Sequence, residues 1–340
     1  MFSVSIIFFL TIMLSLPLTK YSKLPLLFPI CLLIFAFGFR ADFGNDYSSY
    51  HDLYSQYTST NSWIGYEALF YRVLSAFHSF KLFVLAHTVL LCILIYIFIR
   101  TAGAGLSKPV FLAFLLLNPY IFLMHLSAMR QAIAIMLIAI AINTLFMAKS
   151  RIKSLILIFF ATQFHLSALF GLLVYPAYLT RPWRVESVLL LGSLISGIVV
   201  LNLDSLLRNA AAIEPSLSVY SSYLNVDFTG SALGLLSSIL IAILVIYIAS
   251  ESANVPHYVR SICVITMIAS VHTFSVPYLA RLVMYGEVFI PVLAALAFNS
   301  TRKLRKLILL LLIAYFVRYV RFFHSELYGP HYSHLGWSLP

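Results

Sequence analysis

The sequence carries little charge for its length. Only 10% of its 340 residues are Asp, Glu, Lys or Arg, whereas about 25% is usual in a soluble domain. Hydrophobic residues make up 62% of the chain, and the mean hydropathy is +0.97. This composition leaves no room for a water-soluble domain of useful size and predicts an all-α polytopic integral membrane protein, folded as a single transmembrane domain over residues 1–340.

Acidic residues are scarcer than basic ones. The 11 Asp and Glu stand against 22 Lys and Arg, which gives a formal net charge of +11. Membrane proteins collect Lys and Arg in their cytoplasmic loops, and this accounts for most of the excess. The positive charge therefore predicts contact with a lipid bilayer and no nucleic-acid partner.

Several kinds of site are absent from the sequence. The cysteines are isolated inside apolar runs: Cys31, Cys92 and Cys263. They predict neither a disulfide framework nor a metal site. The spacing of His324, His331 and His334 matches no zinc pattern, and no phosphate-binding glycine loop, dinucleotide fingerprint or nucleophile elbow is present. We therefore expect no metal and no cofactor.

Apolar runs long enough to matter in a membrane recur along the whole chain. A full span needs about 20 residues, with a range of roughly 17–25. The runs are residues 2–18, 24–39, 80–99, 109–124, 129–148, 154–179, 187–203, 231–249, 258–277, 282–298 and 306–323. The first run lacks a basic leader and a small-residue cleavage site, so we expect a retained helix.

The charged intervals between the runs indicate which side of the membrane each one faces. Intervals 20–23, 100–108 and 149–153 are basic and are assigned to the cytoplasm. Segment 40–79 contains four of the carboxylates and falls on the other side, so it is expected to be external.

The run 154–179 conflicts with this assignment if it crosses the membrane once. Arg181, Arg184 and the tetrabasic turn 302–306 would then all be external, against the usual rule. The conflict disappears if the run enters, breaks at Gln163–Ser167 and returns. Re-entrant backbone of this kind is tolerated where it is buried in protein or lines a cavity.

We therefore predict about ten full transmembrane helices plus one re-entrant helical hairpin over residues 154–180. Both termini and the active site are expected on the external face. The remaining external parts are a loop over 204–230 and a tail over 324–340. His165 would form the tip of the hairpin and face a cavity at mid-membrane or in the external half.

The cations on the predicted external side are mostly arginines. The external Lys and Arg are Arg40, Arg72, Lys81, Arg130, Arg208, Arg281, Arg318 and Arg321. A signal for topology alone would use Lys as readily, whereas the planar fork of Arg fits phosphate oxygens in a bidentate way. This face therefore predicts an anion site beside the bilayer, with phosphate as the natural ligand.

Two ionisable residues stand out at or inside predicted helices. Arg130 opens the run 129–148, and His165 lies at the proposed break. Such placements are costly and usually serve a site, although Arg130 could simply snorkel to the headgroups and His165 could be a satisfied buried histidine. Tyr285 lies one helical turn after Arg281 and shares its face, while Glu287 is expected to pair with a nearby cation or hydroxyl.

Segment 40–79 mixes carboxylates with many tyrosines and a tryptophan. Carboxylates bind sugar hydroxyls, and aromatic rings pack against the C–H faces of pyranoses. The same composition also fits an interfacial amphipathic helix with an aromatic belt. Both interpretations can hold, because a glycan attached to a lipid would be bound at that interface.

Short motifs in a fixed order carry a family resemblance. They are Arg40-x-Asp-x-Gly-x-Asp-Tyr-x-x-Tyr, Gly65-Tyr-Glu67, Ser127-x-x-Arg130-Gln131, Phe164-His165-x-Ser167-Ala168 and Arg281 near a tyrosine. Together they resemble the EpsG/Wzy-type bacterial polysaccharide polymerases of O-antigen, capsule and exopolysaccharide assembly. Asn45 stands where a threonine is common in this family. The resemblance implies a metal-independent membrane glycosyltransferase in the bacterial inner membrane, which joins undecaprenyl-diphosphate-linked oligosaccharide units at the periplasmic face.

That chemistry suggests a role for each candidate residue. Arg130 and Arg281 are expected to bind the diphosphate, with Arg318 as an auxiliary. His165 is the candidate base, and Asp46 is its rival. The residues expected to help hold the acceptor sugars are Asp42, Tyr47, Glu67 and Tyr285.

Two other functions remain open on the sequence. A flippase or transporter for the same lipid-linked units would also need cations, but deep in a cavity reached from both sides, and often shows internal repeats. An O-antigen ligase-type transferase has nearly the same chemistry. A chain-length regulator protein is a further expected partner of a polymerase.

Overall fold

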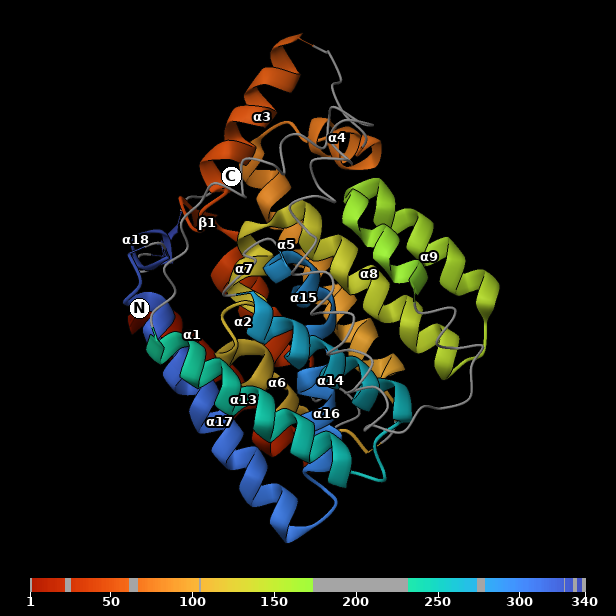
Figure 1. Cartoon of the computed structure of the whole chain (residues 1–340). Coiled ribbons are helices and arrows are strands. Elements are labelled where there is room, and N and C mark those ends of the chain that lie inside the picture. The colour runs from red at the N-terminus through yellow and green to blue at the C-terminus, as the bar shows by residue number, and fades with distance from the viewer. Residues whose placement is uncertain are drawn as a thin grey trace.

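The computed structural model describes residues 2–21, 26–60, 67–103, 105–173, 232–273, 279–326, 328–332 and 335–337. These residues form a bundle of helices with one small strand pair at its end (Figure 1). In the first half the elements are α1 (Phe2–Tyr21), α2 (Leu27–Gly38), β1 (Arg40–Ala41), α3 (Tyr47–Thr60), α4 (Ala68–Ser75), α5 (Phe80–Thr101), α6 (Lys108–Leu117), α7 (Phe122–Ser127), α8 (Met129–Phe146), α9 (Arg151–Phe164) and the 3-10 helix η1 (Leu166–Leu173). In the second half they are α13 (Ala232–Glu251), α14 (His257–His272), α15 (Leu279–Glu287), α16 (Ile290–Ala297), α17 (Arg302–Phe323), α18 (Gly329–Tyr332) and β2 (Gly336–Trp337).

The helices have the length and composition of a membrane protein. Within the described ranges, 4 helical stretches are long and apolar enough to cross a bilayer: Phe80–Thr101, Met129–Phe146, Gly234–Glu251 and Ala280–Ala297. Many large apolar side chains of α1, α9 and α17 are exposed, as lipid-facing side chains are. The fold is therefore a multi-pass helical membrane protein. The number of spans stays a prediction, because the run 187–203 and the loop 204–230 lie outside the described residues.

The loops gather at the two ends of the bundle. At one end the loops that follow α5, α13 and α16 touch, since Asn299 donates to the carbonyl of Gly105 at 2.9 Å and Ser300 donates to Asn254 at 2.6 Å. Segment 40–60 and α4 lie at the other end (Figure 1). There β1 pairs antiparallel with β2, with Arg40 opposite Trp337.

Helix α8 forms the centre of the bundle. Its sequence alternates Ile with Ala, and 14 of its 18 residues are buried. An apolar helix without a polar face belongs inside a bundle, and small residues let its neighbours approach closely. It packs most extensively on α9 and α5. Asn143 near its end accepts a hydrogen bond from Tyr258 at 2.9 Å, which ties α8 to α14.

Two predicted single helices are interrupted in the structure. The run 109–124 ends as α6 at Leu117 and resumes as α7, because Pro119 disfavours helical backbone at Asn118 and supplies no N–H. The run 282–298 divides into α15 and α16, with Pro291 in the first turn of α16. In both cases the apolar pattern continues across the break.

The predicted interruption at Gln163–Ser167 is present. Helix α9 ends at Phe164, and His165 has extended backbone (φ −156°, ψ 123°) before η1 begins. Gly171 in η1 lies against Ile138, midway along α8, because a Cβ there would be 2.5 Å from the Ile138 Cδ1. The chain after His165 therefore contacts the middle of α8, and the re-entrant hairpin stays a prediction. Residues 174–180, the end of the proposed re-entrant hairpin, are outside the described ranges.

The predicted hairpin can be tested by the side of the membrane on which positions 181 and 184 lie. Cysteines placed at Arg181 or Arg184, in a Cys31→Ser background, should resist impermeant thiol reagents in intact cells, because the hairpin returns them to the cytoplasm. Cys31 is removed because it is the exposed one of the three native cysteines. A cysteine in place of the exposed His51 should label as the external control. Labelling at 181 or 184 would contradict the re-entrant fold.

Arg40 is a buried structural cation and not part of the cavity described below. It is 1% exposed. Its guanidinium donates to the carbonyls of Phe37 and Leu126, both at 2.8 Å, and to the hydroxyl of Thr88 at 2.6 Å. The two carbonyls belong to the last turns of α2 and α7, where the helix dipole favours a positive charge. Arg40 thus ties α2, α5 and α7 together beneath segment 40–60.

Candidate active site

A cavity of about 680 Å³ opens among the helix ends that gather at this end of the bundle. Its wall is formed by the loop into α3, the start of α8, the break after α9, and parts of α13, α14, α15 and α17. The polar residues that line it are Asn45, Asp46, Ser49, Tyr50, Tyr120, Arg130, Gln131, His165, Ser237, Ser238, Ser270, Thr273, Arg281, Glu287, Arg318, Arg321, Ser325 and Tyr328. Segments from most of the described chain thus converge on one hollow.

The lining has an excess of positive charge. Its cations are Arg130, Arg281, Arg318 and Arg321, and its carboxylates are Asp46 and Glu287. Each of these arginines presents a planar set of donors that suits phosphate oxygens. A cavity with this balance favours an anionic ligand, and its many hydroxyls suit a ligand that also carries neutral hydrogen-bonding groups.

A carboxylate behind the wall joins two of the lining residues. Glu67, which precedes α4, forms an ion pair through Oε2 with the Nη1 of Arg130. Its other oxygen, Oε1, lies 2.6 Å from the Nδ1 of His165 and 3.4 Å from the amide nitrogen of Leu166. The side chains of Glu67 and His165 are only 12% and 10% exposed. The carboxylate therefore links the start of α8 to the break after α9.

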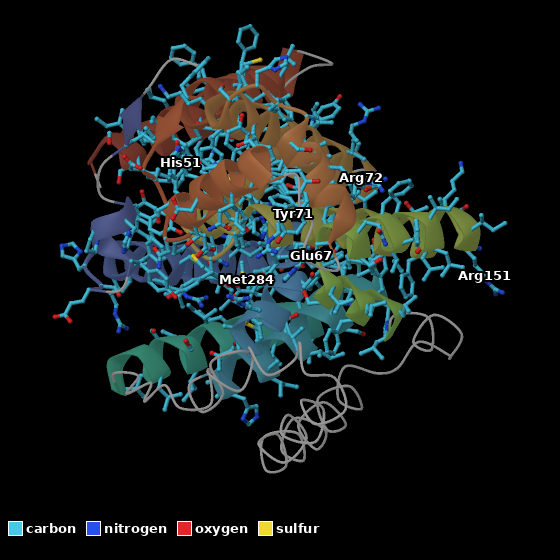
Figure 2. The ribbon with its side chains drawn as sticks, turned by 90° about the horizontal axis from the view of Figure 1, so that it is seen from above. His51, Glu67, Tyr71, Arg72, Arg151 and Met284 are labelled. Carbon is cyan, nitrogen blue, oxygen red and sulfur yellow. The ribbon has the colours of Figure 1, made fainter. Side chains whose placement is uncertain are left out.

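The surroundings keep this carboxylate ionised. Burial of the Glu67 carboxyl would raise its pKa, but the hydrogen bond with His165 and the charge of Arg130 outweigh burial and lower it. Figure 2 looks onto this end of the molecule and shows Glu67 near the centre, close in projection to Tyr71 and Met284. The hydroxyl of Tyr71 accepts a further bond from the Nη1 of Arg130 at 3.4 Å.

Arg318 also has a carboxylate partner. Its Nη1 lies 3.4 Å from the Oε1 of Glu287, and its guanidinium carbon lies 4.4 Å from the ring centroid of Tyr120. Asn118 donates to the other oxygen of Glu287 at 3.4 Å. Glu287 thus pairs with a nearby cation, as expected. The stacked guanidinium of Arg318 is held in place at the cavity wall.

Arg281 is held through its backbone. The side-chain amide of Gln131 donates to the carbonyl oxygen of Arg281 at 2.8 Å, while the Arg281 side chain is exposed. One turn further along α15, the hydroxyl of Tyr285 lies 2.9 Å from that of Ser167. The first helical turns of α8 and α15 are therefore fixed to each other and to η1.

The loop before α3 carries Asp46 into the cavity. Gly44 has φ +102°, a conformation that only glycine adopts without strain. Its amide donates to the carbonyl of His331 at 2.9 Å, and the amide of Asp46 donates to the hydroxyl of Ser127 at 3.0 Å. The short distance between Gly44 and Ser127 lets the loop lie flat on the end of α7.

Gly44→Ala is expected to destabilise the fold and lower activity. The added Cβ would lie 2.8 Å from the Cβ of Ser127, and the backbone strain alone costs roughly 1–2 kcal/mol. Gly105→Ala is the matched control, because Gly105 has φ +88° with nothing within 4 Å. Thermal unfolding in detergent should show a larger loss of melting temperature for Gly44→Ala. Equal losses would mean that contact with Ser127 does not matter.

The structure gathers five of the predicted site residues around one cavity. They are His165, Asp46, Arg130, Arg281 and Arg318. Of the four expected sugar ligands, none is in the lining: Asp42 is exposed, Glu67 and Tyr285 lie behind it with the partners given above, and the Tyr47 hydroxyl donates to the carbonyl of Arg40 at 3.4 Å. Within the described ranges no three His, Cys, Asp or Glu are grouped to hold a metal ion.

Other lining residues were not singled out as site residues from the sequence. Arg321 lies one helical turn beyond Arg318 on α17 and donates to the hydroxyl of Ser237 at 3.4 Å. The Arg-x-x-Arg spacing could have revealed it, because residues three apart share a helix face. Tyr120 and Tyr328 had no such signal, since their positions depend on how distant segments pack.

Comparison with known proteins gives one match. The sequence profile of the EpsG family matches residues 23–333. No curated protein and no solved structure matches this chain. The match covers nearly the whole chain, including every segment that lines the cavity and the motifs that carried the resemblance. The protein is thus a multi-pass helical membrane protein that belongs to the EpsG family.

Proposed function

We propose that this protein is a polysaccharide polymerase of the inner membrane. It joins oligosaccharide repeat units carried on undecaprenyl diphosphate, at the external face. The observation that carries the proposal is one cavity lined by His165, Asp46 and four arginines. A lipid-linked sugar diphosphate combines the two chemistries that this lining suits, namely a phosphate anion and a hydroxyl-rich sugar. Family membership supports the polysaccharide-polymerase class.

The reaction is a displacement at the anomeric carbon of the donor sugar. A hydroxyl of the acceptor unit attacks that carbon, and the bond from the carbon to the diphosphate oxygen breaks. The electron pair of that bond leaves with the lipid diphosphate. The hydroxyl proton passes to a base, for which we propose His165, with Asp46 as the alternative. The developing negative charge on the leaving diphosphate is stabilised by arginines.

We propose that two groups of lining residues share these tasks. Arg281, Arg318 and Arg321 come from α15 and α17 and are proposed to hold the diphosphate. Asn45 and Asp46 come from the loop before α3 and Ser49 from its first turn, and they are proposed to bind sugar hydroxyls. Arg130 and His165 both pair with Glu67, which neutralises part of the charge of Arg130. We therefore place Arg130 between these two groups of residues.

The arrangement favours work at one face. The arginines in the cavity lie at the end of the bundle that holds segment 40–60, which is the predicted external end. The opposite end carries the basic turns expected in the cytoplasm. A polymerase needs access to lipid-linked units from the external face only, whereas a flippase must open its binding site to both faces in turn.

Surface glycan from cells lacking the gene tests this function. We expect single repeat units without the gene, and a ladder of longer chains when the wild-type copy is restored. An Arg130→Ala copy should not restore the ladder. Loss of all surface glycan, single units included, would instead assign the protein to transport or ligation and would overturn the proposal.

A further inference from the structure

The contact between Glu67 and His165 has the geometry of a base held by a carboxylate. The Oε1 of Glu67 lies 2.6 Å from the Nδ1 of His165. A carboxylate accepts hydrogen bonds and does not donate them, so Nδ1 carries the proton. This leaves Nε2 as the nitrogen with the free lone pair in the neutral ring. Since His165 lines the cavity, the basic nitrogen belongs to a side chain in contact with the space for substrate.

The carboxylate is itself fixed in place. The Oε2 of Glu67 pairs with the Nη1 of Arg130, and that guanidinium lies over the neighbouring rings of Tyr50 and Phe70, with its carbon 5.7 Å and 5.8 Å from their centroids. The Oε1 of Glu67 also accepts from the amide of Leu166. Glu67 therefore cannot rotate without losing several bonds, and the imidazole next to it keeps one orientation.

The break in the chain is what makes this contact possible. Because α9 ends at Phe164, the extended backbone of His165 carries its side chain out of the helical register and toward Glu67. In the described part of the chain, the ion pairs at this contact join Glu67, from the segment before α4, to His165 and to Arg130 of α8. The hydroxyl of Tyr71 on α4 joins them through Arg130.

We infer that Glu67 is a positioning residue for the proposed reaction. It holds His165 in the tautomer and orientation in which Nε2 takes the proton of the acceptor hydroxyl, and it stabilises the imidazolium that forms. This inference rests on the proposed function. It also gives Glu67 a different role from direct sugar binding, because both of its oxygens are already engaged by protein donors.

A double-mutant cycle tests the inference on the purified full-length protein. The substrate is lipid-linked repeat units extracted from cells lacking the gene, and the rate of chain lengthening gives kcat and KM. Glu67→Gln should lower kcat by at least about tenfold with little change in KM. The amide can present its NH₂ to Nδ1 and so stabilise the wrong tautomer of His165. Glu67→Asp should recover part of the loss.

The cycle then asks whether Glu67 acts through His165. In a His165→Gln background, Glu67→Gln should change the residual rate by less than about twofold, because the group it positions is gone. Asp52→Asn is the matched control, since Asp52 is an exposed carboxylate on α3 outside the cavity lining. Rates are normalised to monodisperse protein so that loss of folding is not counted as loss of catalysis.

The outcomes separate the inference from the function on which it rests. If Glu67→Gln lowers the rate by the same factor with and without His165, Glu67 acts independently and the inference is wrong. If Glu67→Gln instead raises KM at constant kcat, Glu67 binds sugar directly and the inference is wrong. If the wild-type protein lengthens no chains at all, the proposed function itself fails.

Discussion

Replacing His165 by glutamine is expected to lower the rate of polymer formation by about 10²–10⁴-fold, the usual contribution of a positioned general base. Glutamine keeps a similar reach and can still donate to Glu67, but its amide cannot accept the proton of an attacking hydroxyl. The fold should survive, because the break at this position depends on backbone and not on the ring. The measurement is the glycan ladder at equal membrane abundance.

His51→Gln is the control for this substitution. His51 lies on α3, and its side chain is 57% exposed and outside the cavity lining. It should leave the ladder unchanged. If His165→Gln retains activity within about threefold of wild type, His165 is not the base, and Asp46→Asn becomes the next variant to examine.

Arg281→Lys is expected to lower the rate by about 10²-fold although it preserves the charge. Loss of one well-placed donor to developing charge costs about 10²–10³-fold in other enzymes. Lysine places a point charge where the guanidinium offers a planar fork, and it cannot bind a diphosphate in the same bidentate way. The contact from Gln131 goes to the backbone carbonyl, so the substitution leaves it intact.

Arg72→Gln is the charge control for Arg281. Arg72 is an exposed arginine of α4 at the same end of the molecule, outside the cavity lining. Its removal should reduce polymer formation by less than about twofold even though it lowers the net charge. Comparable losses from both variants would mean that the general positive potential of this end matters, and not a diphosphate contact at Arg281.

The helices of this chain were largely predictable, and their interruptions only in part. The apolar runs that form α5, α8, α13 and α17 have the length of helices. Some also begin at a recognisable N-cap, since the side chains of Ser79 and Thr301 cap the first turns of α5 and α17. The end of α9 at His165 followed from the topology argument. The end of α6 before Asn118 could not be predicted, because the apolar pattern continues through Pro119 and only the helical backbone is interrupted.

The residues that line the cavity were easier to predict from the sequence than their hydrogen-bond partners. Arg130 and His165 stood out because ionisable groups at membrane depth are costly, and Arg281 stood out among the arginines of the predicted external side. The partner of His165 could not be predicted, because Glu67 is 98 residues away in the sequence. The two side chains meet only because α4 packs on α9. Sequence reasoning treated Glu67 as part of an aromatic, acidic segment suited to sugars. Nothing in that segment specifies which carboxylate turns inward.

The pairing of residues 40–41 with the C-terminal segment was likewise not predictable from the sequence. Strands β1 and β2 are two residues long, too short for any periodicity. The ring of Tyr332 packs edge-on to Phe43, with centroids 5.2 Å apart, and closes the tail over the loop that carries Asp46. The charge pattern predicted only that both segments share a side of the membrane.

The most direct test of the account is polymer formation by the purified protein alone. The protein is placed in liposomes, supplied with lipid-linked repeat units from cells lacking the gene, and sampled over time. We expect a ladder of longer lipid-linked chains, one lipid diphosphate released for each bond formed, and neither product with His165→Gln. Units that cross the bilayer without being joined would contradict the proposed function and identify a transporter.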